Sequence, residues 1–120
     1  MSQIRFLDLS DNAITSTSPL SHLPQLAILY LHANRVRTFR EGVLPLTCLK
    51  MLTNVTLHGN PLEETRGTTN QHYRNYVLYL LPQLLKLDFS NVTKQNVEDS
   101  RTWAQIFRRR LMMKEGGRNG

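Results

Sequence analysis

The sequence predicts an α/β solenoid with a parallel β-sheet on its concave side, a helical or irregular convex side and a C-terminal capping helix. An eleven-residue apolar phrase recurs three times with an asparagine at the same place. After the third copy, the apolar residues change to helical spacing. Because stacked coils bury their apolar columns against one another, the repeated phrase indicates one continuous core.

The three copies read IRFLDLSDNAI, LAILYLHANRV and LTNVTLHGNPL, beginning at Ile4, Leu26 and Leu52. Each follows the pattern L-x-x-L-x-L-x-x-N-x-L, which is the leucine-rich repeat signature, at a period in or near the usual range. A fourth copy, LLKLDFSNV, is imperfect: Phe89 takes an inward position, and Val92 stands where the asparagine belongs. The sequence therefore predicts about four coils.

Within each copy, side chains alternate across a short strand, so the leucines face the core and their neighbours face outward. The chain must turn sharply after each strand, which leaves backbone groups inside that need hydrogen-bond partners. An asparagine amide supplies both donors and an acceptor. We therefore predict a buried structural ladder, in which each amide bonds main chain of its own and the adjoining coil: Asn12, Asn34 and Asn60.

Two helices are predicted after the third copy. The first helix is indicated by apolar residues at spacings of three and four, and Pro82 ends this helix. These apolar residues are Tyr73, Tyr76, Val77, Leu80 and Leu81. Thr93 is a suitable N-cap for the second. Its apolar stripe comprises Val97, Ala104, Phe107 and Leu111, with Trp103 and Ile106 beside it. We expect repeats over residues 1–92, a capping helix over 93–112 and a basic Gly-rich tail over 113–120.

The positive charge is concentrated at the C-terminal end. The chain has a formal net charge of +6, of which residues 101–120 carry +5. A basic arm of this kind favours an acidic partner, such as a nucleic acid, an anionic membrane or an acidic protein surface like that of tubulin. The alternative is a solvated helix end favoured by the helix dipole. The arm comprises Arg101, Arg108, Arg109, Arg110 and Lys114.

The outward residues of the strands form a candidate protein-binding face. Phe6, Ile28 and Tyr30 make an apolar cluster where the first two coils meet, and exposed apolar clusters often mark protein contacts. The alternative is accidental exposure without a partner. The predicted concave binding residues are Phe6, Ile28, Tyr30, His32, Asn54, His58 and Lys86.

Catalytic, cofactor and metal sites are not expected. His32 and His58 take equivalent places on adjacent strands, about 5 Å apart, but Ser10 and Ser90 flank them, so a third zinc ligand is lacking. Cys48 is interpreted as core packing on the convex side. No Gly-rich phosphate loop occurs. We expect no enzyme activity, no cofactor and no small-molecule substrate.

A single cysteine rules out an internal disulfide, and no signal peptide or run of about 20 apolar residues is visible. These features predict a cytoplasmic protein that does not enter a membrane.

The phrases YRNYVL and LPQLLKLD, followed by a helix, resemble the C-terminal cap of intracellular leucine-rich repeat proteins. These include the spliceosomal U2 A-prime protein, the Sds-type phosphatase regulator and the outer-arm dynein light chain. The resemblance is narrowed to proteins associated with motile cilia and flagella by the phrases TLHGNP and DFSNVTK and by a late tryptophan. The resemblance implies a non-catalytic axonemal component bound to tubulin or axonemal proteins. A ribonucleoprotein adaptor and a phosphatase-regulating adaptor remain the alternatives, although a nucleic-acid partner is not expected.

The first coil begins at Ile4, and no capping segment precedes it in this sequence. Ile4, Leu7 and Leu9 would leave apolar surface in contact with water, at about 25 cal/mol per Å². We therefore expect a cover over this coil, either further repeats upstream or a neighbouring subunit.

Overall fold

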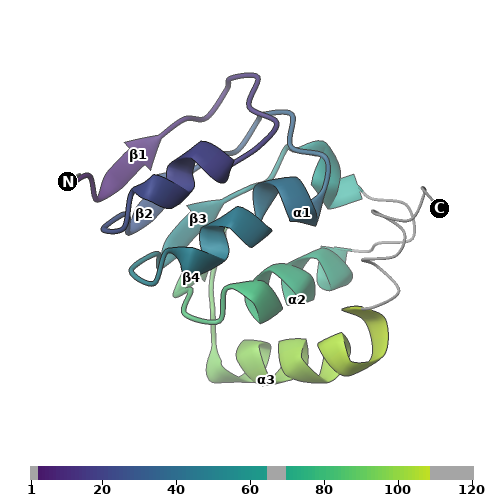
Figure 1. Ribbon diagram of the computed structural model, residues 1–120. Coiled ribbons are helices and arrows are strands. Elements are labelled where there is room, and N and C mark those ends of the chain that lie inside the picture. Colours follow the sequence, from purple (N-terminus) through teal and green to yellow (C-terminus); the bar gives the residue numbers. More distant parts are fainter. Residues whose placement is uncertain (1–2, 65–69, 109–120) are drawn as a thin grey trace.

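The computed structural model describes residues 3–64 and 70–108. A curved sheet lies on one side of the molecule, and helical segments lie on the other (Figure 1). The strands are β1 (Phe6–Asp8), β2 (Ile28–Tyr30), β3 (Asn54–Thr56), β4 (Lys86–Leu87) and β5 (Ser90–Asn91). The α-helices are α1 (Phe39–Gly42), α2 (Asn70–Leu80) and α3 (Lys94–Trp103).

The sheet follows the order of the chain, β1-β2-β3-β4-β5. The first four strands are parallel, and their central residues pair in one row, Leu7 with Leu29, Leu29 with Val55, and Val55 with Leu87. Each coil turns just before its asparagine through a residue with positive φ, namely Asp11, Ala33 and Gly59 in successive coils. The repeated phrases therefore form stacked, equivalent coils, as the sequence predicts.

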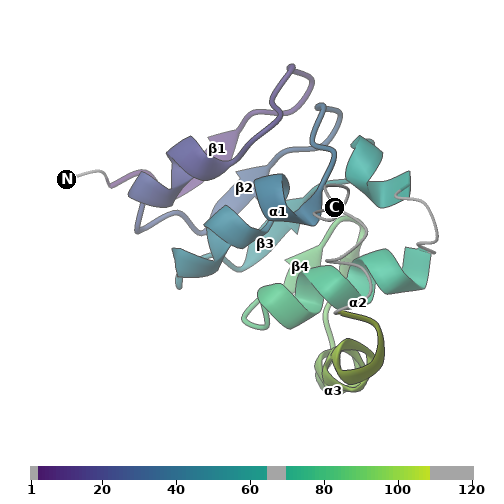
Figure 2. The same cartoon turned by 45° about the vertical axis from the view of Figure 1, so that its right-hand side comes forward.

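Helical turns cover the convex side of the first two coils (Figure 2). Two of them are 3-10 turns that begin with a proline in the first two positions, Ser18–His22 and Leu44–Cys48. Proline suits these positions because its fixed φ is helical and its missing N–H would have no partner there. The core runs between the two layers, and Leu29, Leu31 and Leu57 have no exposed surface.

Cys48 was predicted to be a core residue, and the structure shows that this prediction is wrong, because its side chain is exposed. Leu46 and Leu49 take the inward positions of this turn. Cys48 ends the turn at the surface, with its Sγ 3.4 Å from the carbonyl oxygen of Pro45.

The two C-terminal helices pack on the last coil. Tyr73, Tyr76 and Val77 are buried on the inner face of α2. Thr93 caps α3 through a reciprocal pair of bonds, since its hydroxyl accepts from the Asn96 backbone and the Asn96 side chain accepts from the Thr93 backbone. Trp103 packs on Tyr76 at a ring-centroid distance of 5.3 Å.

The predicted apolar stripe of the capping helix differs in part from the structure. Ala104 and Trp103 are buried and Phe107 is half-buried, but Ile106 is 63% exposed. After Trp103 the helix continues as a wider π-type turn, Ala104–Arg108. Leu111 and the predicted tail 113–120 lie outside the described residues.

The fourth coil departs most from its predicted form. Phe89 was expected to point inward, but it is 79% exposed. The strand stops at Leu87, and Asp88 adopts a φ of 55°, so the chain reverses through a two-residue turn. Ser90 then pairs antiparallel with Leu87. The turn comes earlier than in the other coils, which interrupts the inward–outward alternation before Phe89.

Leu7 and Leu9 of the first coil are half-buried and pack against the core from one side, whereas Ile4 is exposed. Within the part of the chain that the structure describes, no helix has both the length and the apolar character needed to cross a bilayer.

Candidate functional site

The asparagines hold successive coils together. The Asn34 side-chain nitrogen donates to the carbonyls of Leu9 and Leu31 at 2.9 and 3.0 Å. Its oxygen accepts from the backbone N–H groups of Asn12 and Ile14, both at 3.1 Å. Three of these four hydrogen bonds connect Asn34 to the preceding coil, and the bond to Leu31 stays within its own coil.

Asn60 repeats this arrangement one coil later. Its side-chain nitrogen donates to the carbonyls of Leu31 and Leu57, both at 2.9 Å, and its oxygen accepts from the Val36 backbone at 3.0 Å. Asn12 differs, because its side chain is exposed and donates only within its own coil, to Leu9 and Ser10. The expectation of a buried amide is thus wrong for Asn12, which lies in the edge coil of the described sheet.

A row of five aromatic rings crosses the concave face, and we call it the aromatic row. The Phe6 and Tyr30 rings meet edge to face with centroids 5.3 Å apart, and Tyr30 lies 6.0 Å from His32. The His32 and His58 rings stack at 4.7 Å with only 5° between their planes. His58 lies 4.3 Å from the ring of Phe89. The row therefore joins coils one to four.

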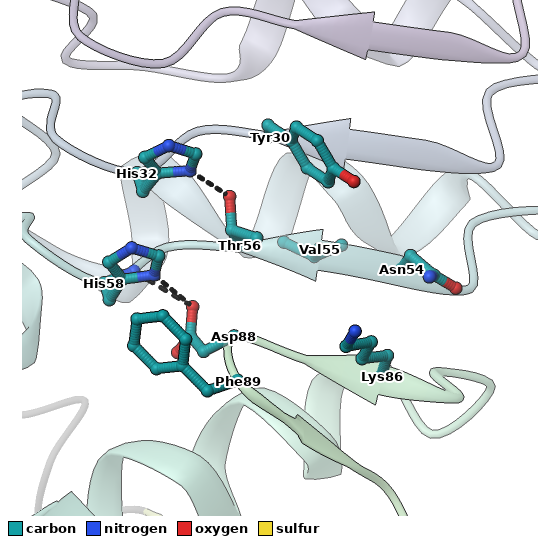
Figure 3. A pocket seen from close by; sticks show the side chains of 9 residues that line it. All are labelled: Tyr30, His32, Asn54, Val55, Thr56, His58, Lys86, Asp88 and Phe89. Carbon is teal, nitrogen blue, oxygen red and sulfur yellow. Dashed lines mark hydrogen bonds and ion pairs between the residues drawn. The ribbon is translucent and has the colours of Figure 1, made fainter.

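Each histidine of the row contacts a polar side chain of the next coil. The His32 Nδ1 atom lies 2.7 Å from the Thr56 hydroxyl, which also accepts from the Leu31 backbone at 3.1 Å. The His58 Nδ1 atom lies 3.3 Å from an Asp88 carboxylate oxygen. These contacts fix both rings on the sheet (Figure 3).

Asp88 is surrounded by donors. One carboxylate oxygen accepts from the backbone N–H groups of Leu57 and His58 at 2.6 and 3.0 Å. The other oxygen accepts from the Tyr73 hydroxyl of α2 at 2.8 Å. Burial raises the pKa of Tyr73 well above its usual value, and the neighbouring Asp88 charge raises it further.

Asp8, the second carboxylate of the concave face, also accepts hydrogen bonds. One Asp8 oxygen accepts from the Ser10 hydroxyl at 2.6 Å and from the Ser10 backbone at 3.0 Å. The hydrogen bond from the Ser10 hydroxyl is the main cause that lowers the pKa of Asp8, and the bond from the Ser10 backbone is the second. Both concave carboxylates therefore already have protein donors.

A groove of about 280 Å³ lies over β3 and β4 beside the aromatic row (Figure 3). Five of the predicted binding residues line it: Tyr30, His32, Asn54, His58 and Lys86. Phe6 lies on the row but not at the groove, and Ile28 lies between Phe6 and Asn54 in the sheet register. Within residues 3–64 and 70–108, neither the Asn54 amide nor the Lys86 ammonium has a side-chain hydrogen bond or ion pair.

Sequence reasoning did not place Asp88 and Phe89 in the site. Aspartate tolerates the left-handed conformation, so Asp-Phe followed by Ser-Asn is compatible with a tight turn. That signal was obscured by the similarity of LLKLDFSNV to the three regular copies. The structure brings Asp88 into contact with His58, at 3.3 Å.

The predicted basic arm falls mostly outside the described part of the chain. Arg101 is exposed on α3, and Arg108 ends the turn Ala104–Arg108. Arg109, Arg110 and Lys114 lie outside the described residues. Within residues 3–64 and 70–108, no three His, Cys, Asp or Glu side chains are grouped so as to hold a metal ion.

Comparison with known proteins agrees with the repeat pattern. A family model described as "Leucine-rich repeat" matches residues 1–115. The chain is 42% identical over 107 residues to leucine-rich repeat-containing protein 51 of Bos taurus, and 41% identical to that of Homo sapiens. These matches cover 88% of this chain and 50% of each relative. The chain thus spans about half the length of these relatives.

More distant similarities concern other repeat proteins. The probable U2 small nuclear ribonucleoprotein A′ of Drosophila melanogaster is 27% identical over 135 residues, covering 96% of this chain and 50% of the relative. The crystal structure of the Drosophila melanogaster SNF/U2A′ complex superposes with a TM-score of 0.75 at 22% identity, covering 93% of this chain and 62% of that chain. The Chaetomium Mex67:Mtr2 structure gives a TM-score of 0.61 at 23% identity, with coverage of 82% and 63%.

Proposed function

This chain belongs to the leucine-rich repeat family, and from that premise we propose that it is a non-catalytic module that binds a protein segment on its concave face. The observation that carries this proposal is the aromatic row. Phe6 is 52% exposed and Phe89 is 79% exposed, at opposite ends of the row. Large aromatic side chains on a surface contribute much of the energy of protein interfaces when a partner covers them.

Site-specific crosslinking tests this function. A photoreactive phenylalanine analogue replaces Phe6 or Phe89 on the concave face, and Ile106 serves as a control because it is also apolar and exposed but lies on the C-terminal cap. We expect one and the same protein to crosslink from both concave positions and not from position 106. Equal crosslinking from all three positions, or none from the concave pair, would remove the concave face from the function.

The proposed setting is the ciliary or flagellar axoneme, where the module would bind microtubules or their attached complexes. Support comes from the resemblance of TLHGNP, DFSNVTK and the late tryptophan to repeat proteins associated with motile cilia. Fractionation of demembranated axonemes tests the setting. The protein should remain in the microtubule pellet after ribonuclease treatment and leave it only at raised salt.

A ribonucleoprotein adaptor is the second candidate. It is favoured by the similarity to the U2 small nuclear ribonucleoprotein A′ relative, whose Drosophila structural counterpart was crystallised with SNF. In that case ribonuclease should release the chain at low salt, and contacts to phosphates should weaken steeply as salt rises. The same fractionation therefore separates the two candidates.

A further inference from the structure

The concave groove has two chemically different ends. At one end, Phe89 presents an exposed ring against His58. At the other, Asn54 and Lys86 lie side by side on β3 and β4 (Figure 3). His58 lies four positions after Asn54 and two beyond the end of β3, which corresponds to about 13 Å at the rise of an extended chain.

The negative charges of the concave face have hydrogen-bond partners, whereas its positive charge does not. Asp8 and Asp88 already accept hydrogen bonds from protein donors. Among the described residues, the Lys86 ammonium has no carboxylate partner, and the amide of the adjoining Asn54 is also free of hydrogen bonds. The groove therefore offers unused donors and one unused positive charge, and a carboxylate is the group that satisfies both.

We propose that the groove selects a protein segment carrying one large apolar side chain and one carboxylate, about 13 Å apart. The apolar side chain packs on Phe89 and the histidine pair, while the carboxylate accepts from Lys86 and Asn54. An extended segment covers this distance in four residues, and a helix covers it in about nine. This inference rests on the proposed function and specifies the chemistry of its partner.

A single-stranded nucleic acid also combines stacking groups with negative charge. It requires a groove whose positive charge follows a run of phosphates. Here the outward residues on the strands and directly after them include one lysine, Lys86, and two carboxylates, Asp8 and Asp88, so these residues do not form a run of positive charge. A protein segment that places one carboxylate beside the Lys86 ammonium matches this surface better than a nucleic acid does.

A display library of random 12-residue peptides, panned on the full chain, tests the proposal. We expect the enriched peptides to carry one Asp or Glu and one large apolar residue at a spacing consistent with 13 Å. Lys86→Glu should weaken an enriched peptide about tenfold, and exchanging the acidic residue of that peptide for lysine should restore its affinity. Phe89→Ala should also weaken binding about tenfold. The matched control is Lys94→Glu, an exposed lysine at the start of α3 outside the groove.

Four results would overturn the proposal. The first is enrichment of peptides without an acidic residue, and the second is equal affinity for the Lys86→Glu and Lys94→Glu proteins. The third is binding of an oligouridine that depends on Phe89, which would assign the face to nucleic acid. A library without any enrichment also overturns this partner chemistry, whereas persistent crosslinks from Phe6 and Phe89 would leave the proposed function in place.

Discussion

The imidazole of His58 and the carboxylate of Asp88 are in contact, with Nδ1 and Oδ1 3.3 Å apart, although 30 residues separate them in sequence. The same carboxylate accepts from two backbone N–H groups of coil three and from the Tyr73 hydroxyl of α2. Asp88 thus joins the third coil, the fourth coil and the cap.

Asp88→Ala should lower the free energy of unfolding by about 2–3 kcal/mol, because it leaves the Leu57 and His58 N–H groups and the Tyr73 hydroxyl without their charged acceptor. Chemical denaturation measures this loss. Asp99→Ala, an exposed aspartate on α3, should change the value by less than about 0.5 kcal/mol. Equal effects of the two substitutions would mean that the Asp88 contacts contribute nothing to stability.

Tyr73 should make the fold sensitive to alkaline pH. Its folded-state pKa is raised above the ordinary value of 10.0, first by burial and then by Asp88. Its contribution to stability is therefore fully present below pH 10 and is lost as the pH rises through the folded-state pKa. Denaturation curves from pH 8 to 11.5 should show that this alkaline loss is smaller in Tyr73→Phe. Parallel pH profiles of the two proteins would contradict the prediction.

Asn34→Leu should destabilise the protein by about 1–3 kcal/mol, since the backbone groups of Asn12, Ile14 and Leu9 lose buried partners. Asn12→Leu is the matched substitution in the edge coil, and its cost should stay below about 1 kcal/mol because the Asn12 side chain is exposed. Thermal melting of both variants gives the comparison, and the reverse order would contradict the described ladder.

Phe89→Ser should leave the melting temperature almost unchanged, because the ring is largely exposed. Leu87→Ala, two positions earlier and fully buried, should cost about 2–5 kcal/mol. A large decrease in the melting temperature of Phe89→Ser would mean that the ring is buried in the core, as the repeat pattern predicts.

The basic arm gives a prediction about binding rather than stability. Replacing Arg108, Arg109 and Arg110 by glutamate should abolish co-sedimentation with axonemal microtubules, because it reverses the charge that attracts an acidic surface. The melting temperature of the triple variant should match that of the parent. Retained co-sedimentation at physiological salt would exclude the arm from the contact.

The regular coils could be predicted from sequence because an aliphatic residue at each inward position, most often leucine, and an asparagine at each turn leave one register that satisfies both the core and the backbone. The first helix of the cap was equally readable, since Tyr73, Tyr76 and Val77 follow the helical period and are buried. Thr93 supplied the start of the second.

Where sequence reasoning failed, a local backbone conformation decided the outcome. Asp88 takes the left-handed conformation two residues after β4 begins, so the inward place of Phe89 in the repeat pattern became a surface place. The contact between His58 and Asp88 depends on that turn. Cys48 was assigned to the core because it lies in an apolar run, but the 3-10 turn directs Leu46 and Leu49 inward instead.

Four side chains accept hydrogen bonds from backbone groups of the preceding coil. Asn34 and Thr56 satisfy backbone groups of the coil before their own, and so do Asn60 and Asp88. During synthesis, coils one to three therefore leave the ribosome with backbone donors whose side-chain acceptors lie in the following coil. Nascent chains that end after the third coil lack Asp88, so the backbone N–H groups of Leu57 and His58 are without this acceptor. The third coil gains these hydrogen bonds only when the fourth coil has been translated.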